Sequence, residues 1–424
     1  MIFNFLQKIK SDFLKNFLTL LSGSILAQLI VVSVSPFLTR LYEPVIFGTS
    51  ALFMSIVNIL SIAVTGRYEM AIIQTKRDYD GLSLLIISLL LSISFSLFGY
   101  FLYYIFFQDL QYIDKLNNQL SGYLLFIPLL VIFVVLIKTF NNYLNRNKYY
   151  ESIAVNQVSL SLFQSIGKIV FGLSVVFSNG LIVGTIIGQA ITSLFIILRY
   201  SKNYFSKIKF LKAMLRIKYN LIKYKNFPKI LLISDSINVI GYQLPFILSS
   251  SLYSLEKLGY LSLAYSMSSM PLTVVGTSIS RVFRQRMSEE YNNTGSCDKI
   301  FKRLLQKIIL LITIPFILIY FFAPWIFEFV FGSQWKESGE IVQILLIMFY
   351  FQFIARNFAY MYILSDHQKD NLYIQLVLLF GVLVIFSVGG WMSFKFQTTL
   401  LLFSLFYSFM YIYVIIQSYK FSKG

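Results

Sequence analysis

Long stretches without a single charged residue recur along the whole chain, and they restrict the folds open to it more than any other feature. A helix needs about 20 mostly apolar residues to cross the hydrocarbon core of a bilayer. The chain offers such a run at residues 16–39, 44–66, 81–108, 116–137, 258–280, 308–327, 371–394 and 396–419. With 57% hydrophobic and only 13% charged residues, the composition excludes a soluble globular protein.

Three longer apolar tracts carry one interior charge each and raise the number of predicted spans to twelve. Residues 152–198 are long enough for two helices with a break at Ser-Asn-Gly (178–180), and residues 230–255 and 341–365 add one helix each. The first apolar run is too long for the core of a signal peptide, and no small-residue cleavage pattern follows it. We therefore expect residues 17–39 to remain as the first helix. The predicted fold class is an all-α integral membrane protein.

The basic residues are distributed unevenly between alternate loops. With loops assigned in turn, 29 of the 36 lysines and arginines share the side of the N-terminus, two lie inside helices, and only Arg40, Lys115, Lys257, Lys336 and Lys395 lie opposite. Loops rich in lysine and arginine stay in the cytoplasm, so both termini are predicted to be cytoplasmic. The net charge of +18 therefore reflects topology, with a lesser role in attracting anionic membrane lipids, and it does not indicate a nucleic-acid partner.

A basic segment, residues 199–229, divides the chain at its middle. It has ten lysines and arginines and no acidic residue, with apolar residues at roughly helical spacing. This pattern is typical of an amphipathic helix in the membrane interface, and docking of another protein is the alternative. We predict an N-terminal six-helix lobe over 1–198, a cytoplasmic linker over 199–229 and a C-terminal six-helix lobe over 230–424.

The first helix of each predicted lobe ends in a similar way, which suggests an internal repeat. Pro36 stands 12 residues before Gly48, and Pro245 stands 14 residues before Gly259. In both cases a Pro-Phe-aliphatic sequence near the end of one span precedes a glycine that opens the next. Because both lobes begin in the cytoplasm, the repeat is parallel, and the substrate path is expected between the lobes.

Several segments resemble, in order and spacing, the polysaccharide repeat-unit flippases of the multidrug/oligosaccharidyl-lipid/polysaccharide exporter superfamily. They are SPFLTRLYEPVIFGTSALF (35–53), GRYEMAIIQ (66–74), NNYLNRNKYYESIA (141–154) and FGSQWKESGE (331–340). The resemblance implies two lobes like those of the multidrug exporters of this superfamily, in a multi-pass protein of the bacterial cytoplasmic membrane. Lipid II flippases of the superfamily typically have fourteen helices, and twelve predicted here argue against that assignment.

The function that the resemblance implies is translocation of undecaprenyl-pyrophosphate-linked oligosaccharides from the inner to the outer leaflet. The product is O-antigen, capsule or a related polymer, and the polymerase and ligase machinery that consumes the cargo is a candidate partner. Since no nucleotide-binding loop is visible, any uphill step depends on a coupling ion, H+ or Na+, or on consumption of the cargo outside. We expect the two lobes to alternate in access around a cationic cavity.

Two basic residues lie inside predicted spans and are the first candidates for contact with an anionic cargo. A charge near the centre of a spanning helix costs about 2.5–3.5 kcal/mol and usually faces the bundle interior. Lys168 is expected roughly 22 Å along its helix, with about 15 Å remaining, and Arg356 lies nearer the cytoplasmic end of its helix. We predict that both bind the pyrophosphate or an acidic sugar. The alternative is structural: Lys168 pairs with Asp235, or either basic residue bonds a helix-end carbonyl.

Four charged residues at the ends of spans complete the predicted site. Asp235 is a candidate carrier of the coupling ion, or it only complements the positive end of its own helix. Arg67 and Glu69 are predicted at the cytoplasmic entrance as substrate-binding and ion-coupling residues, with a solvated ion pair as the alternative. Arg40, at the outer end of the first helix, either contacts the phosphate on exit or pairs with Glu43.

No enzyme chemistry is indicated, and no cofactor or metal site is predicted. The single cysteine, Cys297, and the single histidine, His367, are too few for a metal cluster. Two other functions remain open. A multidrug exporter of the same superfamily would carry organic cations, which prefer an anionic or aromatic cavity. A membrane-embedded polysaccharide polymerase would usually carry a larger extracytoplasmic loop than residues 108–121 or 323–340 provide.

Overall fold

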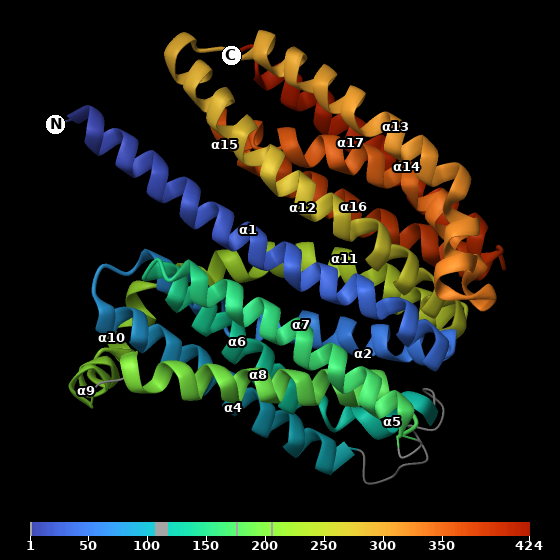
Figure 1. Ribbon diagram of the computed structural model, residues 1–424, viewed down its shortest axis with the longest axis horizontal. Coiled ribbons are helices and arrows are strands. Elements are labelled where there is room, and N and C mark those ends of the chain that lie inside the picture. Colours follow the sequence, from blue (N-terminus) through green and yellow to red (C-terminus); the bar gives the residue numbers. More distant parts are fainter. Residues whose placement is uncertain (1, 107–117, 175–176, 205–206) are drawn as a thin grey trace. The chain divides into compact units, whose positions relative to one another are not determined.

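A computed structural model describes residues 2–106, 118–174, 177–204 and 207–424, and every regular element in these ranges is a helix (Figure 1). The predicted outer loop 108–121 lies mostly outside them. The elements of the first half are α1 (Ile2–Leu41), α2 (Pro44–Ala63), α3 (Tyr68–Ala71), η1 (Ile72–Gln74), α4 (Asp78–Phe106), α5 (Asn118–Leu124), α6 (Ile127–Arg146), α7 (Tyr150–Leu173), α8 (Gly180–Tyr204), α9 (Lys207–Leu215) and α10 (Ile217–Lys223). Those of the second half are η4 (Phe227–Leu231), α11 (Leu232–Leu252), α12 (Leu255–Thr294), α13 (Asp298–Phe331), η5 (Ser333–Trp335), α14 (Lys336–Phe358), α15 (Met361–Leu364), α16 (Gln368–Trp391) and α17 (Phe396–Phe421).

The all-α membrane fold is confirmed. Within the described ranges, 10 helices are long and apolar enough to cross a bilayer, so the chain is a multi-pass membrane protein. The predicted break at 178–180 is also confirmed, because α7 ends at Leu173 and α8 begins at Gly180. Two further long helices, α7 with 24 residues and α12 with 40, are more polar and are not among the 10. Twelve spans, with both termini in the cytoplasm, stay a prediction.

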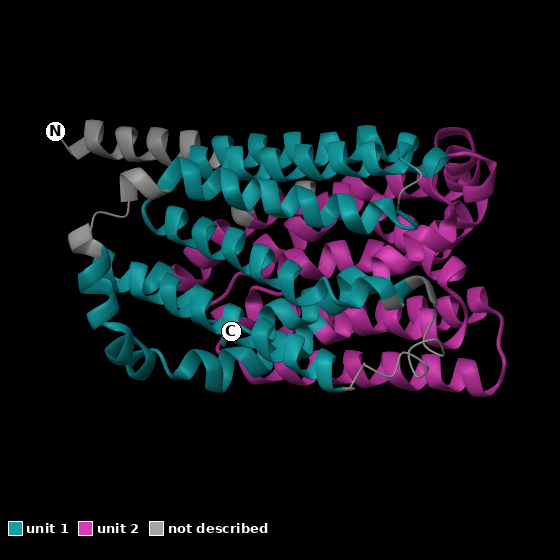
Figure 2. Ribbon diagram, turned by 90° about the horizontal axis from the view of Figure 1, so that it is seen from below, with its two compact units in different colours: residues 1–41, 52–239 teal, residues 42–51, 240–424 magenta. Residues whose placement is uncertain are grey.

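The chain forms two compact units, drawn in different colours in Figure 2. The first unit comprises residues 1–41 and 52–239, and the second comprises residues 42–51 and 240–424. The described part of the predicted linker belongs to the first unit, where Arg216 pairs with Asp80 at the start of α4 (Nε to Oδ1, 3.0 Å). The unit boundary therefore falls inside α11 and not at residue 229. The predicted lobes 1–198 and 230–424 stay a prediction as a functional division.

Helices α7 and α8 of the first unit approach so closely that their backbones touch. Gly184 and Gly188 of α8 are spaced as in a Gly-xxx-Gly motif, which lets two membrane helices pack without intervening side chains. A methyl group built on Gly184 would overlap the backbone of Gly167 and Lys168, and one built on Gly188 would lie 2.6 Å from the Cα of Gln164. Lys168 therefore lies where the backbones of α7 and α8 are in direct contact.

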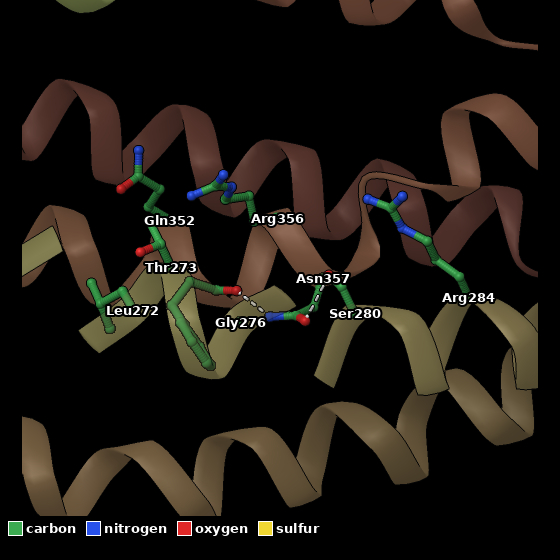
Figure 3. Close-up of a pocket in the computed structure, with 9 residues that line it drawn as sticks. Leu272, Thr273, Gly276, Ser280, Arg284, Gln352, Arg356 and Asn357 are labelled. Carbon is green, nitrogen blue, oxygen red and sulfur yellow. Dashed lines mark hydrogen bonds between the residues drawn. The ribbon is translucent and has the colours of Figure 1, made fainter. Parts of the chain in front are cut away.

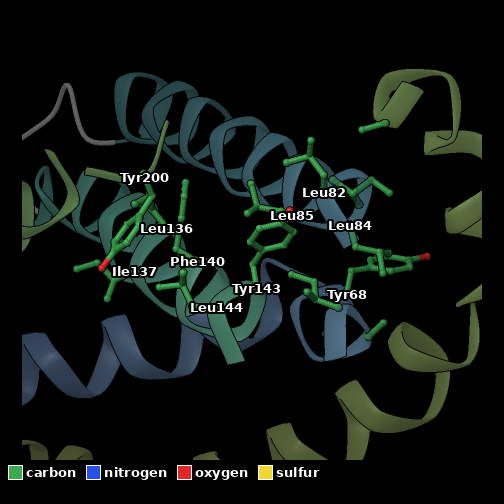
Figure 4. Close-up of a cluster of buried hydrophobic side chains, with 14 of the residues drawn as sticks. Tyr68, Leu82, Leu84, Leu85, Leu136, Ile137, Phe140, Tyr143, Leu144 and Tyr200 are labelled. Atoms are coloured by element: carbon green, nitrogen blue, oxygen red, sulfur yellow. The ribbon is translucent and has the colours of Figure 1, made fainter. Parts of the chain in front are cut away.

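A buried apolar cluster in the same unit holds the turn after α2 against α4 and α6 (Figure 4). Leu82 and Leu85 of α4 meet Phe140 and Tyr143 of α6 in this cluster, and Tyr68 of α3 joins it. Each of these side chains is at most 7% exposed. Burial of a large apolar side chain contributes about 1.5–3 kcal/mol to the stability of the fold. The cluster therefore holds the backbone of the neighbouring polar residues in place.

The second unit contains a reciprocal contact between the first turns of α2 and α12. A methyl group built on Gly48 would overlap the carbonyl oxygen of Leu255, and one built on Gly259 would overlap the carbonyl oxygen of Pro44. Leu255 stands four residues before Gly259, and Pro44 stands four residues before Gly48. The two sides of the contact are therefore equivalent, which supports the predicted internal repeat at these two glycines.

Two side chains from the segment 331–340 pack against this contact and bond to it. Trp335 is fully buried, and its ring meets the ring of Phe47 edge-on at 4.7 Å between centroids. Lys257 of α12 bonds both carboxylate oxygens of Glu337 at 2.7 and 2.8 Å. The aromatic and charged side chains of this segment thus serve the packing of α2 and α12 against the start of α14.

Candidate functional site

A polar pocket opens within the second unit, between α12 and α14. Its cavity volume is about 190 Å³, and Figure 3 shows Arg284 extending from α12 and Arg356 from α14. The other residues that line it are Leu272, Thr273, Gly276, Ser280, Gln352, Phe353 and Asn357. Two successive spacings of four residues place Gly276, Ser280 and Arg284 on one face of α12, so a single helix face supplies about half of the pocket.

Hydrogen bonds fix the neutral polar side chains of this pocket. The Ser280 hydroxyl donates to Oδ1 of Asn357 at 2.9 Å, and the Asn357 amide donates to the carbonyl of Phe353 at 2.7 Å. Gln352 donates through Nε2 to the hydroxyl of Tyr411 at 2.8 Å. These bonds hold the walls of the pocket in one arrangement.

Both arginines keep exposed side chains, and the described residues lining the pocket include no acid. The Arg284 guanidinium lies 5.4 Å from the ring centroid of Tyr360, a cation–π contact that orients it without using its N–H groups. Each guanidinium offers five donors in a planar fork that matches a phosphate or carboxylate. The pocket is therefore suited to an anion and poorly suited to an organic cation.

Of the two arginines that line the pocket, the sequence prediction included Arg356 and did not include Arg284. We predicted a cytoplasmic loop over 281–307 and assigned its basic residues to topology, whereas α12 continues as a helix to Thr294. The spacing of Gly276, Ser280 and Arg284 was the available signal. It was hidden because the apolar run ends at residue 280 while the helix does not.

A second polar site lies in the first unit and joins three of the predicted residues. Arg67 donates through Nε to Oδ2 of Asp235 at 2.7 Å and through Nη1 to Oε1 of Glu69 at 3.0 Å. Nζ of Lys138 lies 3.9 Å from the same oxygen of Glu69. The partner that the structure gives Asp235 is therefore Arg67, and two acids and two bases form one network.

Burial makes this network more than a surface ion pair. The side chain of Glu69 is 0% exposed, that of Arg67 is 11% exposed and that of Asp235 is 26% exposed. The backbone of Arg67 has φ 61°, a left-handed conformation that is uncommon for a residue with a side chain and often marks a functional position. The solvated pair that we held as the alternative for Arg67 and Glu69 does not match this burial.

Two of the segments that carry the family resemblance meet at this network. Asn142 donates through Nδ2 to the carbonyl of Glu69 at 3.0 Å, which ties the segment 141–154 to the segment 66–74. Arg146 donates through Nε to the carbonyl of Thr75 at 3.0 Å and pairs with Asp78 at 2.7 Å. The sequence placed these motifs far apart, and the fold brings them together.

Neither Lys168 nor Arg40 is among the residues that line the pocket or among the four that form the network of Arg67, Glu69, Lys138 and Asp235. Lys168 is partly buried and stands five residues before the end of α7 at Leu173, about 7.5 Å of helix. It is thus nearer a helix end than the 15 Å expected. Arg40 is exposed and donates through Nη1 to the carbonyl of Pro36 at 3.0 Å, one turn back in α1.

Comparison with known proteins gives one family and several solved folds. The sequence profile of a family described as "Polysaccharide biosynthesis protein" matches residues 37–340. No curated protein sequence matches the chain. In the part of the chain that the structure describes, no cluster of three metal-binding side chains is present.

The similar solved structures share the fold at low sequence identity. The lipid II flippase MurJ, in an inward closed conformation, has a TM-score of 0.67 at 15% identity, over 94% of this chain and 90% of that chain. A transporter of the MOP superfamily from Pyrococcus furiosus, described as having a binding pocket of reverse polarity, has a TM-score of 0.61 at 11% identity, over 95% and 94%. An inward-facing multidrug transporter of the MATE family has a TM-score of 0.56 at 14% identity, over 94% and 93%.

Proposed function

The chain belongs to the family of polysaccharide biosynthesis proteins, and on that premise we propose that it is a flippase for lipid-linked oligosaccharides. The proposed cargo is an undecaprenyl-pyrophosphate-linked repeat unit, moved from the inner to the outer leaflet of the bacterial cytoplasmic membrane for O-antigen or capsule assembly. The fold it shares with a lipid II flippase supports transport of a lipid-linked substrate.

The observation that carries this proposal is the pocket between α12 and α14. Arg284 and Arg356 supply two guanidinium groups, and the neutral lining side chains add hydroxyl and amide groups. A pyrophosphate has several anionic oxygens that can each accept a hydrogen bond, and one arginine side chain can donate two parallel hydrogen bonds to two such oxygens. We place the pyrophosphate at these two arginines, and we propose that Lys168 and Arg40 contact the cargo at other stages of an alternating-access cycle.

Translocation in proteoliposomes tests the role of the pocket. With a labelled undecaprenyl-pyrophosphate oligosaccharide, Arg284→Gln and Arg356→Gln are each expected to lower the initial rate about tenfold, because a hydrogen bond to a charged group is worth about 1.5–3 kcal/mol. Arg286→Gln is the matched control, since Arg286 is exposed on the same helix and does not line the pocket. Lys168→Gln and Lys168→Arg measure the contribution of Lys168 in the same assay.

An organic cation serves as the control cargo in this experiment. Transport of the lipid and not the cation by wild type, with loss in both pocket variants, supports the flippase. If only the cation moves, the protein is a multidrug exporter. If Arg356→Gln and Arg286→Gln transport the lipid at equal rates, the pyrophosphate does not bind in this pocket.

We propose further that the network of Arg67, Glu69, Lys138 and Asp235 couples transport to an ion. Asp235 is its most exposed carboxylate, and binding of H+ or Na+ there would weaken its attraction to Arg67. Asp235→Asn is then expected to abolish the response of the rate to an imposed ion gradient, while exchange without a gradient continues. Comparing pH and Na+ gradients identifies the ion.

Asp78→Asn is the control for the coupling experiment, because Asp78 pairs with Arg146 in the same unit but is 49% exposed. Its response to both gradients should equal that of wild type. If Asp235→Asn still responds fully, the coupling ion binds elsewhere or transport is uncoupled.

A further inference from the structure

A second cavity, distinct from the arginine pocket, lies between α16 and α17 of the second unit. Its volume is about 480 Å³. Aromatic and aliphatic side chains make most of its wall, and a few polar groups interrupt them. The lining residues are Tyr362, Asp370, Tyr373, Ile374, Val377, Phe409, Met410, Tyr413, Gln417 and Phe421.

The lining of this groove changes from polar to apolar along the helices. Asp370 is in the first turn of α16 and Phe421 ends α17, so one end of the groove lies where these two antiparallel helices begin and end. Val377 is seven residues further along α16, about 10 Å deeper at 1.5 Å per residue. Phe409 is twelve residues before Phe421, about 18 Å deeper. A groove of this form matches an amphipathic molecule with its head at the helix ends.

A buried hydroxyl at the polar end is without a hydrogen-bond partner among the residues that the structure describes. Tyr362 is 1% exposed, and its Oη atom has no hydrogen bond within the described structure. Leaving a buried hydroxyl unsatisfied costs about 1–3 kcal/mol. Because Tyr362 lines the groove, an acceptor on a bound molecule would satisfy this group.

The charge of the groove selects the kind of head that it would hold. Asp370 brings a carboxylate, and the described lining residues include no lysine or arginine. Tyr373 and Tyr413 add aromatic faces that attract cations. The head should therefore carry a positive group for Asp370 and an acceptor for the hydroxyl of Tyr362.

We propose that this groove binds an aminophospholipid of the surrounding bilayer, with its ammonium group at Asp370 and its phosphate at the hydroxyl of Tyr362. One acyl chain follows Ile374, Val377 and Phe409 into the apolar part. The ligand is not the proposed cargo, because a pyrophosphate lacks the ammonium group that Asp370 would bind. The site is independent of the flippase function.

Lipid retention measured by native mass spectrometry tests the site. The purified full chain is exchanged into detergent with phosphatidylethanolamine, phosphatidylglycerol or phosphatidylcholine at equal concentration. We expect phosphatidylethanolamine to be retained about tenfold more than phosphatidylglycerol, because only the former has an ammonium group. Phosphatidylcholine should be intermediate, since its quaternary ammonium contacts aromatic faces but donates no hydrogen bond.

Matched variants locate the bound lipid. Asp370→Asn should lower retention of phosphatidylethanolamine at least fivefold and leave that of phosphatidylglycerol unchanged, whereas Tyr362→Phe removes the donor to the phosphate and should lower retention of both lipids. Asp366→Asn is the control, because Asp366 is an exposed acid four residues away that does not line the groove. Val377→Trp should fill the apolar part and lower retention of all three lipids, which tests the groove even if an Asp370 variant folds poorly. Equal retention of the two headgroups by wild type, or no effect of Asp370→Asn, overturns the proposal.

Discussion

Replacing Arg67 with methionine is expected to lower the free energy of unfolding by about 3–5 kcal/mol, the usual loss when one partner of a buried ion pair is removed. Glu69 has a side chain that is 0% exposed. Without Arg67 its remaining cationic neighbour in the network is Lys138, whose Nζ is 3.9 Å away. The carboxylate would stay buried with little compensation. Unfolding in mixed micelles, followed by far-UV circular dichroism, measures the change.

A double variant separates the charge from the packing. Arg67→Met combined with Glu69→Gln removes the uncompensated charge, and it should recover more than half of the stability lost by Arg67→Met alone. Lys336→Met is the control, because Lys336 and Glu328 form a pair whose side chains are 57% and 44% exposed, and such pairs are worth about 1 kcal/mol or less. A loss below 1 kcal/mol for Arg67→Met would show that the network does not stabilise the fold.

Alanine at Gly48 or at Gly259 is expected to be nearly as harmful, with a loss of about 3 kcal/mol for either substitution, the upper part of the range for overpacking. The added methyl group would overlap a carbonyl oxygen of the facing helix, and a backbone atom cannot rotate away as a side chain can. The two helices must separate, which also disturbs the packing of Trp335 beside them. The melting temperature in detergent and the yield of monodisperse protein report the effect.

Gly241→Ala is the control for this experiment. Gly241 lies inside α11, and a methyl group there would meet only the side chain of Leu379 at 3.7 Å, an ordinary contact. Because alanine favours a helix more than glycine does, this variant should be as stable as wild type or slightly more stable. Wild-type stability for Gly48→Ala would show that the close approach of α2 and α12 is not needed.

Hydropathy was sufficient to predict the membrane fold. A segment that crosses the bilayer must form its backbone hydrogen bonds within itself, as a helix does, and each such helix appears in the sequence as a continuous run of apolar residues. The break between α7 and α8 followed from Ser-Asn-Gly in the same way. Helix ends outside the apolar runs were not predictable by this means. Residues 281–294 of α12 are polar and still helical, and the second arginine of the pocket was missed for that reason.

The partners of charged residues could not be predicted from the sequence. Asp235 and Arg67 are 168 positions apart, and no periodicity relates them. Lys168 and Arg356 were grouped as cargo-binding residues because each is a charge within an apolar tract. The structure gives them different surroundings: a close backbone contact between two helices for Lys168 and a polar pocket for Arg356. Local patterns identify which residues are unusual, and only the fold shows what each one contacts.

The reciprocal contact of Gly48 and Gly259 has a consequence for the comparison of homologous sequences. Each glycine meets the main chain of the other helix, and every amino acid carries the same main chain. A substitution on one helix therefore has no compensating substitution on the other, so the two positions have no means to change together. Methods that infer contacts from correlated changes between alignment columns should find no signal here, although the helices touch more closely at this point than side chains would allow.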